Sequence, residues 1–342
     1  MSKGFPDSYS LGDRTITLIV SQGPLRVSLL GGGSDLPTFL ESDEGHALGF
    51  TIDKRVYVVG HPFWHRSGIR LRYSRSEDVR NTDQIEHPIA ARVFADYGIN
   101  DIDVAIMSDV PAGTGLGSSS AFTVALLSFS RSLVGRESDP LELAEEAIQV
   151  EVDQLQEPIG YQDHWLSALG GLNLLHFPIS QESRSLPRIE SILLRRESSE
   201  KLSRNLRLVP VGKPRSASAL LIDQQTVLQK STKKRSLTRE LGSLAIHGGH
   251  AIRNDIDSLG PLLKEAWSLK VEINPHVTNS EVDSLVDLVM RNGATGAKLL
   301  GAGASGFVAA YVPDDQTIKF NSLQLPELTY TLTTKGAGLL ST

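Results

Sequence analysis

The sequence is organised around residues 109–121, which read DVPAGTGLGSSSA and lead directly into an apolar segment. Its three alternating glycines, Gly113, Gly115 and Gly117, permit positive φ angles and let backbone N–H groups converge on an anion. Residues 121–129 (AFTVALLSF) contain no helix breaker, which predicts a buried helix. Because the N-terminus of that helix would point its free amides at the loop, the stretch predicts a phosphate-binding turn.

Three serines follow the glycines, and their hydroxyls can bind phosphate oxygens or a metal ion: Ser118, Ser119 and Ser120. No lysine follows the glycines, so the loop is not the G-x-x-x-x-G-K-[ST] pattern of nucleotide triphosphatases. The alternative is a Gly/Ser-rich turn that only reverses the chain and caps the helix. Pro111, the serine triplet and the immediate apolar helix favour phosphate binding.

The composition limits the classes of function. The 342 residues are 40% hydrophobic, enough to fill sizeable cores, and the net charge is −6 without a basic tract, so we expect no nucleic-acid partner. No apolar run reaches the roughly 18 residues of a membrane span, and we expect no membrane partner. The absence of cysteine excludes disulfides, thiolate chemistry and Cys-ligated zinc. We expect a cytoplasmic enzyme.

An acidic residue follows the predicted strands near the N-terminus. Residues 15–20 (TITLIV) and 25–30 (LRVSLL) predict two strands, and the second continues into GGGSD at residues 31–35. This order places Asp35 at the end of a strand, where it can hold a ligand or merely stabilise the turn. Arg26, within the second strand, is either a ligand-binding cation or half of a structural ion pair.

Two further carboxylates stand in or near helices. The sequence from Asp139 to Leu155 starts with an N-cap, a proline and a glutamate, and on a helical wheel Glu151 lies at the edge of the apolar stripe. A half-buried carboxylate there needs a cation unless it reaches solvent. Asp163 stands in the first turn of a helix that opens at Tyr161, as a functional group or as a simple N-cap.

The second half of the chain follows a polar stretch, residues 180–205, which is the best candidate for a domain boundary. It predicts a strand over 217–222, helices across 235–270 and over 279–292, a glycine loop at 296–306 and a strand over 307–312. A basic cluster precedes the helices, either facing the cleft or as a solvated helix start: Lys230, Lys233, Lys234 and Arg235.

Three segments resemble the motifs of the GHMP kinases. Residues 23–40 resemble the first motif, residues 111–121 (PAGTGLGSSSA) the second, and residues 298–306 (KLLGAGASG) the third. The resemblance implies an α+β fold with a domain like domain 2 of ribosomal protein S5, over residues 1–190, and a ferredoxin-like domain, over 191–342. The active site would lie between the two domains.

The resemblance also implies roles for individual residues. ATP would be held by Pro111, Gly113, Thr114, Gly115, Leu116, Gly117, Ser118, Ser119 and Ser120. Mg²⁺ would be held by Ser119 and Glu151. Asp163, twelve residues after Glu151, would act as the catalytic base, with Arg26 beside the transferred phosphoryl group. The substrate would contact Gly32, Gly33, Ser34, Asp35 and Gly303.

Within the family, residues 23–40 are most similar to heptose-phosphate kinases, which implies phosphorylation of the anomeric hydroxyl of a heptose 7-phosphate. The substrate side departs from that pattern at Thr226-Val227 and Lys230, and Ala304-Ser305 replaces glycines in the third motif. The alternatives are another sugar 1-kinase, of the L-fucokinase or galactokinase type, and a non-catalytic binding protein. The expected partners are ATP and a sugar phosphate, and the sequence leaves open whether the chain forms a homodimer.

Overall fold

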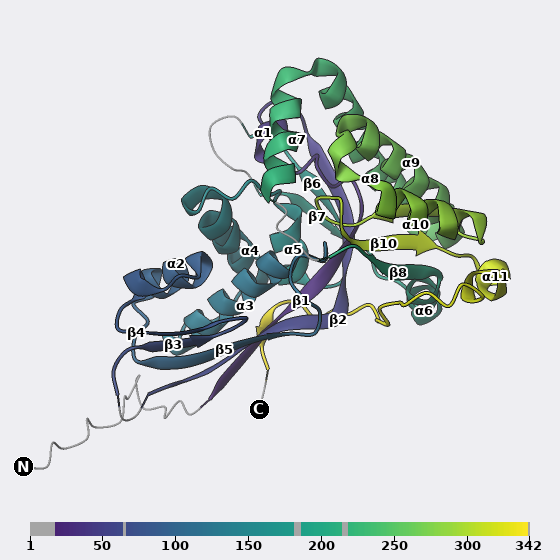
Figure 1. Ribbon diagram of the computed structural model, residues 1–342. Helices are drawn as coiled ribbons and strands as arrows, with labels where there is room; N and C mark the ends of the chain where they lie inside the picture. The colour runs from purple at the N-terminus through teal and green to yellow at the C-terminus, as the bar shows by residue number, and fades with distance from the viewer. Residues whose placement is uncertain (1–17, 64–65, 181–185, 214–217, 341–342) are drawn as a thin grey trace, which may run out of the picture.

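A computed structural model describes residues 18–63, 66–180, 186–213 and 218–340 (Figure 1). Within these residues the larger sheet has eight strands, in the order β11-β1-β2-β5-β3-β4, with β6 on β2 and β7 on β6. All its strand pairs are antiparallel except β3 with β5. Its strands are β1 (Ile19–Leu30), β2 (Gly45–Pro62), β3 (Ile69–Arg72), β4 (Ser76–Val79), β5 (Ile102–Ser108), β6 (Leu172–Phe177), β7 (Arg188–Ser191) and β11 (Gly338–Leu339).

The first strand is longer than the sequence predicts. The two strands expected over 15–20 and 25–30 are one strand, β1, although residues 15–17 lie outside the described part of the chain. Gly23-Pro24 falls within β1, and the pairing with β2 shifts register between Pro24 and Arg26. An irregularity of this kind tolerates the missing N–H of proline, so the strand bends without ending.

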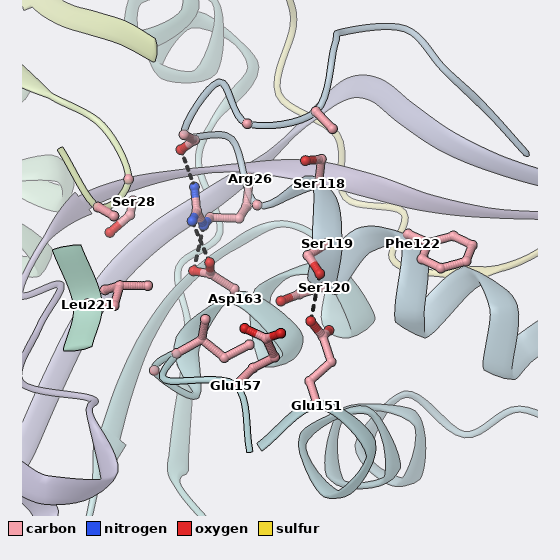
Figure 2. A pocket seen from close by; sticks show the side chains of 18 of the residues that line it. Arg26, Ser28, Ser118, Ser119, Ser120, Phe122, Glu151, Glu157, Asp163 and Leu221 are labelled. Carbon is pink, nitrogen blue, oxygen red and sulfur yellow. Dashed lines mark hydrogen bonds and ion pairs between the residues drawn. The ribbon is translucent and has the colours of Figure 1, made fainter. Parts of the chain in front are cut away.

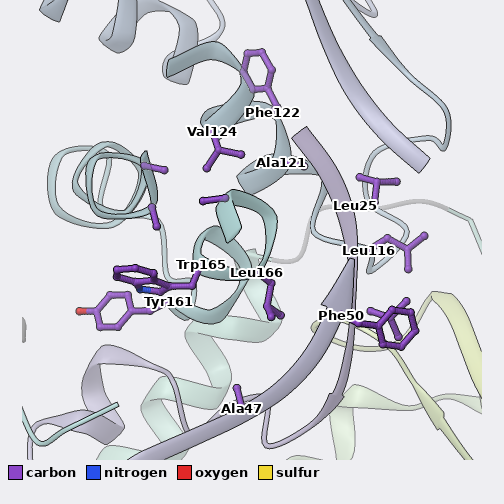
Figure 3. Packing of buried hydrophobic residues seen from close by; sticks show 14 of the residues in the cluster. Leu25, Ala47, Phe50, Leu116, Ala121, Phe122, Val124, Tyr161, Trp165 and Leu166 are labelled. Atoms are coloured by element: carbon purple, nitrogen blue, oxygen red, sulfur yellow. The ribbon is translucent and has the colours of Figure 1, made fainter. Parts of the chain in front are cut away.

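Helices from the first half of the chain cover one face of this sheet: α2 (Pro88–Asp96), α3 (Ser118–Leu133), α4 (Pro140–Ile148) and α5 (Gln162–Leu169) (Figure 1). The buried helix predicted after the glycine loop is confirmed as α3, whose apolar side chains lie in the main core. Phe122, Val124 and Trp165 belong to this core, with Leu25 of β1 (Figure 3). The short helix α1 (Pro37–Leu40) follows the turn after β1.

The helix predicted from Asp139 begins as expected. The Asp139 side chain accepts hydrogen bonds from the backbone N–H groups of Leu141 and Glu142, with Pro140 at the first helical position. After Ile148 the α-helix gives way to a π-helical turn, Gln149–Gln154. This change alters which side chains face the core beyond residue 148.

The second sheet is antiparallel, in the order β8-β10-β9: β8 (Leu206–Val211), β9 (Gly296–Leu299) and β10 (Gly306–Tyr311). The remaining helices are α6 (Arg196–Asn205), α7 (Ser218–Lys230), α8 (Thr232–Asn254), α9 (Leu259–Ile273), α10 (Ser280–Arg291) and α11 (Thr317–Asn321). Helix α8 packs against both β2 and α9, so it joins the two halves of the molecule (Figure 1).

The strand predicted over 217–222 is wrong, because residues 218–230 form α7 and residue 217 lies outside the described part of the chain. The short apolar run there continues into residues that favour a helix, without a glycine or proline to end it. The helices predicted across 235–270 and 279–292 are confirmed as α8, α9 and α10.

The domain division at residue 190 stays a prediction. The C-terminal segment returns to the larger sheet, where β11 pairs with β1 and Leu332 forms a bridge with Ile52. Among the described helices, none combines the length and apolar character of a membrane span.

Candidate active site

One cavity, of about 910 Å³, brings together residues from both halves of the chain. Its walls come from β1, the turn after β1, the glycine loop before α3, and α5, and on the other side from α7, α9, β9 and the loop after β9. Figure 2 shows Arg26, Asp163, Glu151 and the three serines turned toward this space. The two glycine loops and the three candidate charged side chains therefore share one site.

The loop before α3 has the backbone geometry that its glycines permit. Gly113, Gly115 and Gly117 have φ angles of 75°, 81° and 72°, and Gly117 is the N-cap residue of α3. A Cβ on Gly117 would lie 3.0 Å from the Arg26 side chain. The positive φ angles therefore favour glycine at all three positions, and a side chain at Gly117 would also displace Arg26. The helix N-terminus opens directly onto the cavity through Ser118, Ser119 and Ser120.

The glycine loop after β9 packs directly against the loop before α3. A Cβ on Gly301 would lie 2.5 Å from the Gly115 Cα atom, and one on Gly115 would lie 2.6 Å from the Leu300 carbonyl oxygen. A Cβ on Gly306 would meet the Thr114 carbonyl oxygen at 2.5 Å. Side chains at these positions would force the two loops apart. The glycines therefore allow the second half of the chain to pack closely against the loop before α3.

Arg26 forms an ion pair with Asp163. Arg26 Nε donates to Asp163 Oδ1 at 2.6 Å and Nη2 donates to Oδ2 at 2.5 Å, while Nη1 donates to the Gly115 carbonyl at 2.6 Å. The Arg26 side chain is 5% exposed and that of Asp163 24%. The guanidinium thus connects the glycine loop to a carboxylate that stays open to the cavity, and it fixes the orientation of that carboxylate.

Glu151 is buried, not half-buried as the helical wheel predicts. It lies in the π-helical turn, where the rotation per residue is smaller than in an α-helix, so a wheel drawn at 100° per residue misplaces it. Its carboxylate accepts hydrogen bonds from Ser119 Oγ (2.6 Å) and Thr123 Oγ1 (2.6 Å) and pairs with His164 Nε2 (3.1 Å). Burial raises the pKa of Glu151, but these partners outweigh burial and hold it below its usual value.

The Glu151–Ser119 pair suits a magnesium ion that also binds phosphate. The described residues contain no group of three or more His, Asp or Glu side chains that would form a protein-only metal site. Magnesium in kinases is commonly held by one or two carboxylates together with substrate phosphates, and it prefers oxygen ligands. Glu151 and Ser119 supply such oxygens at the N-terminus of α3, beside the loop proposed to hold phosphates.

Asp35 is fixed in the turn after β1 by three hydrogen bonds. Its carboxylate accepts from Gly33 N (2.9 Å), Gln162 N (3.0 Å) and Gln162 Nε2 (3.0 Å). The Gln162 Oε1 atom accepts a hydrogen bond from Ser28 Oγ at 2.7 Å. Burial raises the pKa of Asp35, although the backbone hydrogen bonds from Gln162 and Gly33 lower it. The Ser28–Gln162–Asp35 chain thus presents Asp35 to the cavity beside Asp163.

Some of the residues that the sequence predicts for the site do not line the cavity. Leu116 is a core residue, Thr114 donates its hydroxyl to the Pro111 carbonyl, and Ser34 donates to the backbone carbonyls of Gly31 and His46. These side chains stabilise the loops from outside the cavity. Gly303 packs against Val277, where a Cβ would lie 2.7 Å from the Val277 Cα atom. Pro111 is likewise absent from the cavity wall.

The basic cluster at residues 230–235 does not reach the cavity either. Arg235 binds Asp43 and the carbonyls of Thr38 and Phe39, and Lys233 pairs with Glu272. These contacts connect α8 to α1 and α9. Two lysines from other elements, Lys270 and Lys298, line the cavity instead.

Sequence reasoning missed Ser28, Gln162, His164, Lys270 and Lys298 as site residues. Gln162 and His164 flank Asp163, so proximity to the candidate base was a usable signal. Lys298 opens the third glycine segment, and its Nζ donates to the carbonyls of Ser28 (3.1 Å) and Leu29 (2.8 Å). Lys270 lies in an amphipathic helix without a local motif, and only the packing of α9 beside β1 brings it to the site.

Comparison with known proteins identifies the class to which this arrangement belongs. Residues 85–171 match the GHMP kinases N-terminal domain, and residues 250–319 match the GHMP kinases C-terminal domain. The chain belongs to the GHMP kinase family. The α+β fold that the sequence predicts is confirmed.

Individual relatives are similar over most of this chain. D-glycero-alpha-D-manno-heptose 7-phosphate kinase of Campylobacter jejuni is 25% identical over 90% of this chain and 92% of its own length. The bifunctional fucokinase/GDP-fucose pyrophosphorylase of Arabidopsis thaliana is 26% identical over 86% of this chain but only 30% of its own. The crystal structure of a D-glycero-D-manno-heptose 1-phosphate kinase from Bacteroides thetaiotaomicron has a TM-score of 0.74 at 21% identity, covering 95% of this chain and 99% of the other.

Proposed function

We propose that the protein is an ATP- and magnesium-dependent sugar kinase that phosphorylates the anomeric hydroxyl of a heptose 7-phosphate. The observation that carries this proposal is the Arg26–Asp163 pair, which joins a cavity-facing carboxylate to the loop proposed to hold phosphates. Family membership supports ATP as the phosphoryl donor. The presence of both Glu151 and Asp163 in the cavity argues against a protein that only binds ligands.

In the proposed reaction the acceptor hydroxyl oxygen forms a bond to the γ-phosphorus of ATP. The bond from that phosphorus to the β–γ bridging oxygen breaks, its electron pair leaves with ADP, and the hydroxyl proton passes to an Asp163 carboxylate oxygen. Because the transition state of phosphoryl transfer is loose, orientation of the acceptor matters more than strong basicity. Arg26 holds Asp163 in place and adds positive charge beside the transferred group.

The residues around the reacting groups have separate tasks. The backbone N–H groups from Gly113 to Ser118 and the N-terminus of α3 would bind the ATP phosphates. Glu151 and Ser119 would hold magnesium, which neutralises phosphate charge when bound. Asp35, buried and hydrogen-bonded through Gln162, would accept hydrogen bonds from sugar hydroxyls.

The heptose assignment rests on the relatives. The Campylobacter jejuni kinase matches over 90% of this chain and 92% of its own length. A galactokinase of Thermotoga neapolitana is 24% identical over 84% of this chain and 87% of its own length, and a fucokinase matches at similar identity. A sugar 1-kinase of the fucokinase or galactokinase type is therefore the second candidate. It shares the proposed roles of Arg26, Asp163 and Glu151 and differs only in the acceptor.

An ADP-release assay over a panel of acceptors tests the proposal. The panel contains D-glycero-D-manno-heptose 7-phosphate, the free heptose, L-fucose and galactose, each with ATP and magnesium. We expect heptose 7-phosphate to exceed every free sugar by about a hundredfold in kcat/KM, because losing two charged hydrogen bonds costs roughly 1.5–3 kcal/mol each. Equal or faster turnover of a free sugar would favour a sugar 1-kinase of the fucokinase or galactokinase type. Failure to phosphorylate any of these acceptors would contradict the proposed kinase activity.

A further inference from the structure

Lys270 is a buried cation in the cavity wall that none of the motifs includes. It comes from α9, is 9% exposed, and donates a hydrogen bond from Nζ to the Gly301 carbonyl oxygen. The charged groups that act on it are Arg26 of β1, Asp35 of the turn after β1, Asp163 of α5 and Lys298 of β9. Lys270 thus lies among the groups proposed to bind and activate the acceptor.

Lys270 differs from the other cations of the cavity wall in its unused hydrogen-bond donors. Among the residues that the structure describes, Arg26 is committed to Asp163 and the Gly115 carbonyl, and Lys298 to the carbonyls of Ser28 and Leu29. Lys270 has a single hydrogen-bond acceptor in the described ranges, the Gly301 carbonyl. Because an ammonium group has three N–H donors, two remain for a ligand.

The position of the ammonium group points to the phosphoryl group as that ligand. The Gly301 backbone lies against Gly115 of the loop before α3, and Arg26 donates a hydrogen bond to the Gly115 carbonyl oxygen. The Lys270 ammonium is therefore held beside the loop proposed to bind phosphates, and the carboxylates of Asp35 and Asp163, proposed to contact the acceptor, also act on it. A phosphoryl group that moves from ATP to an acceptor must cross this junction.

We propose that Lys270 is a catalytic residue whose ammonium group donates hydrogen bonds to the γ-phosphoryl oxygens while that group passes from ATP to the acceptor oxygen. The inference rests on the proposed kinase activity but not on the identity of the acceptor. As the bond to the β–γ bridging oxygen breaks and the bond to the acceptor oxygen forms, the ammonium keeps its proton and offsets the negative charge on the phosphoryl oxygens.

Burial and nearby Arg26 lower the pKa of Lys270 to about 8, although the carboxylates of Asp35 and Asp163 act in the opposite direction. A dianionic phosphoryl group in contact with the ammonium would raise that pKa and keep the side chain charged during transfer. A lysine that merely held the Gly301 carbonyl in place would have no requirement for charge.

Equilibrium binding of two nucleotides tests the proposal without an acceptor. Calorimetry compares ADP with the non-hydrolysable β,γ-imido analogue of ATP, both with magnesium, for wild type, Lys270→Met and Lys270→Gln. Lys264→Met is the matched control, because Lys264 lies on the exposed side of the same helix. We expect Lys270→Met to weaken binding of the analogue about tenfold or more while ADP binding changes by less than about twofold. Lys270→Gln, which keeps a donor without the charge, should fall between Lys270→Met and wild type, and the control should match wild type.

Three results would overturn the proposal. Unchanged binding of the analogue would show that Lys270 does not contact the γ-phosphoryl group. An equal loss for ADP and the analogue would assign Lys270 to another phosphate or to the fold. A raised KM for a phosphorylated acceptor alone, with the analogue unaffected, would place the substrate's own phosphate at Lys270. If none of the sugars is phosphorylated, the proposed substrate is wrong. The comparison of ADP with the ATP analogue still tests the role of Lys270, because it needs no acceptor.

Discussion

Arg26 and Asp163 stand 137 residues apart in the sequence and meet through two parallel hydrogen bonds, of 2.6 Å and 2.5 Å. The two-point contact fixes the plane of the carboxylate as well as its position. Because Arg26 also donates to the Gly115 carbonyl, the guanidinium connects the glycine loop to the candidate base.

Replacing Asp163 with asparagine keeps the size of the side chain but removes its capacity to accept the acceptor proton. We expect turnover to fall by roughly 10²–10⁴-fold, while calorimetric ADP affinity changes by less than about twofold, because the proposed contact of Asp163 is with the acceptor and not with the nucleotide. Asp287→Asn, on the exposed face of α10, should behave as wild type. Turnover near the wild-type value in Asp163→Asn would remove the assignment of the base.

The sequence predicts those parts of the site that follow from local chemistry. The alternating glycines Gly113, Gly115 and Gly117 predict positive φ angles, and the apolar run after them predicts the helix α3. The environment of Glu151 could not be predicted, because the switch to a π-helical turn has no local signal and rotates that carboxylate inward. Lys270 enters the site through long-range packing, which a helical or strand periodicity does not encode. The strand expected over 217–222 failed because a short apolar run fits either a strand or part of a helix.

Replacing Glu151 with glutamine tests the magnesium site. The amide keeps part of the hydrogen bonding with Ser119 and Thr123 but loses the charge, so we expect the magnesium concentration for half-maximal rate to rise about tenfold or more. Glu145→Gln, a half-exposed residue of α4, serves as the control. A loss of activity that excess magnesium leaves unchanged, together with a lower melting temperature, would assign Glu151 a structural role.

Replacing Gln162 with leucine tests whether the Ser28–Gln162–Asp35 chain positions Asp35 for the acceptor. The variant removes the side-chain hydrogen bonds to both Asp35 and Ser28. We expect the KM of the acceptor to rise about tenfold or more, with an unchanged KM for ATP, because an unsatisfied buried polar group costs roughly 1–3 kcal/mol. The control is Gln229→Leu at an exposed position of α7. Equal effects on both KM values would contradict a role confined to the acceptor.

Replacing Lys270 with methionine should change the dependence of stability on pH. Burial and Arg26 lower the pKa of Lys270 to about 8, so the buried charge destabilises the folded protein below pH 8. Between pH 8 and the usual lysine pKa near 10.5, the folded state loses this proton before the unfolded state does, and the penalty fades as pH rises. Thermal unfolding should therefore show Lys270→Met at least as stable as wild type at pH 7, with an advantage that shrinks toward pH 10. Lower stability at pH 7 would indicate that the contact with Gly301 supports the fold.

Phosphorus NMR of the reaction product tests the central claim most directly. Wild-type protein is incubated with ATP, magnesium and heptose 7-phosphate, and Asp163→Asn is treated identically. We predict a new sugar-phosphate signal coupled to the anomeric proton, beside the retained 7-phosphate signal, in an amount equal to the ADP formed, and a yield reduced by orders of magnitude in the variant. ADP without a new sugar phosphate, a phosphate on a different hydroxyl, or an equal yield from Asp163→Asn would contradict an anomeric kinase built on the Arg26–Asp163 pair.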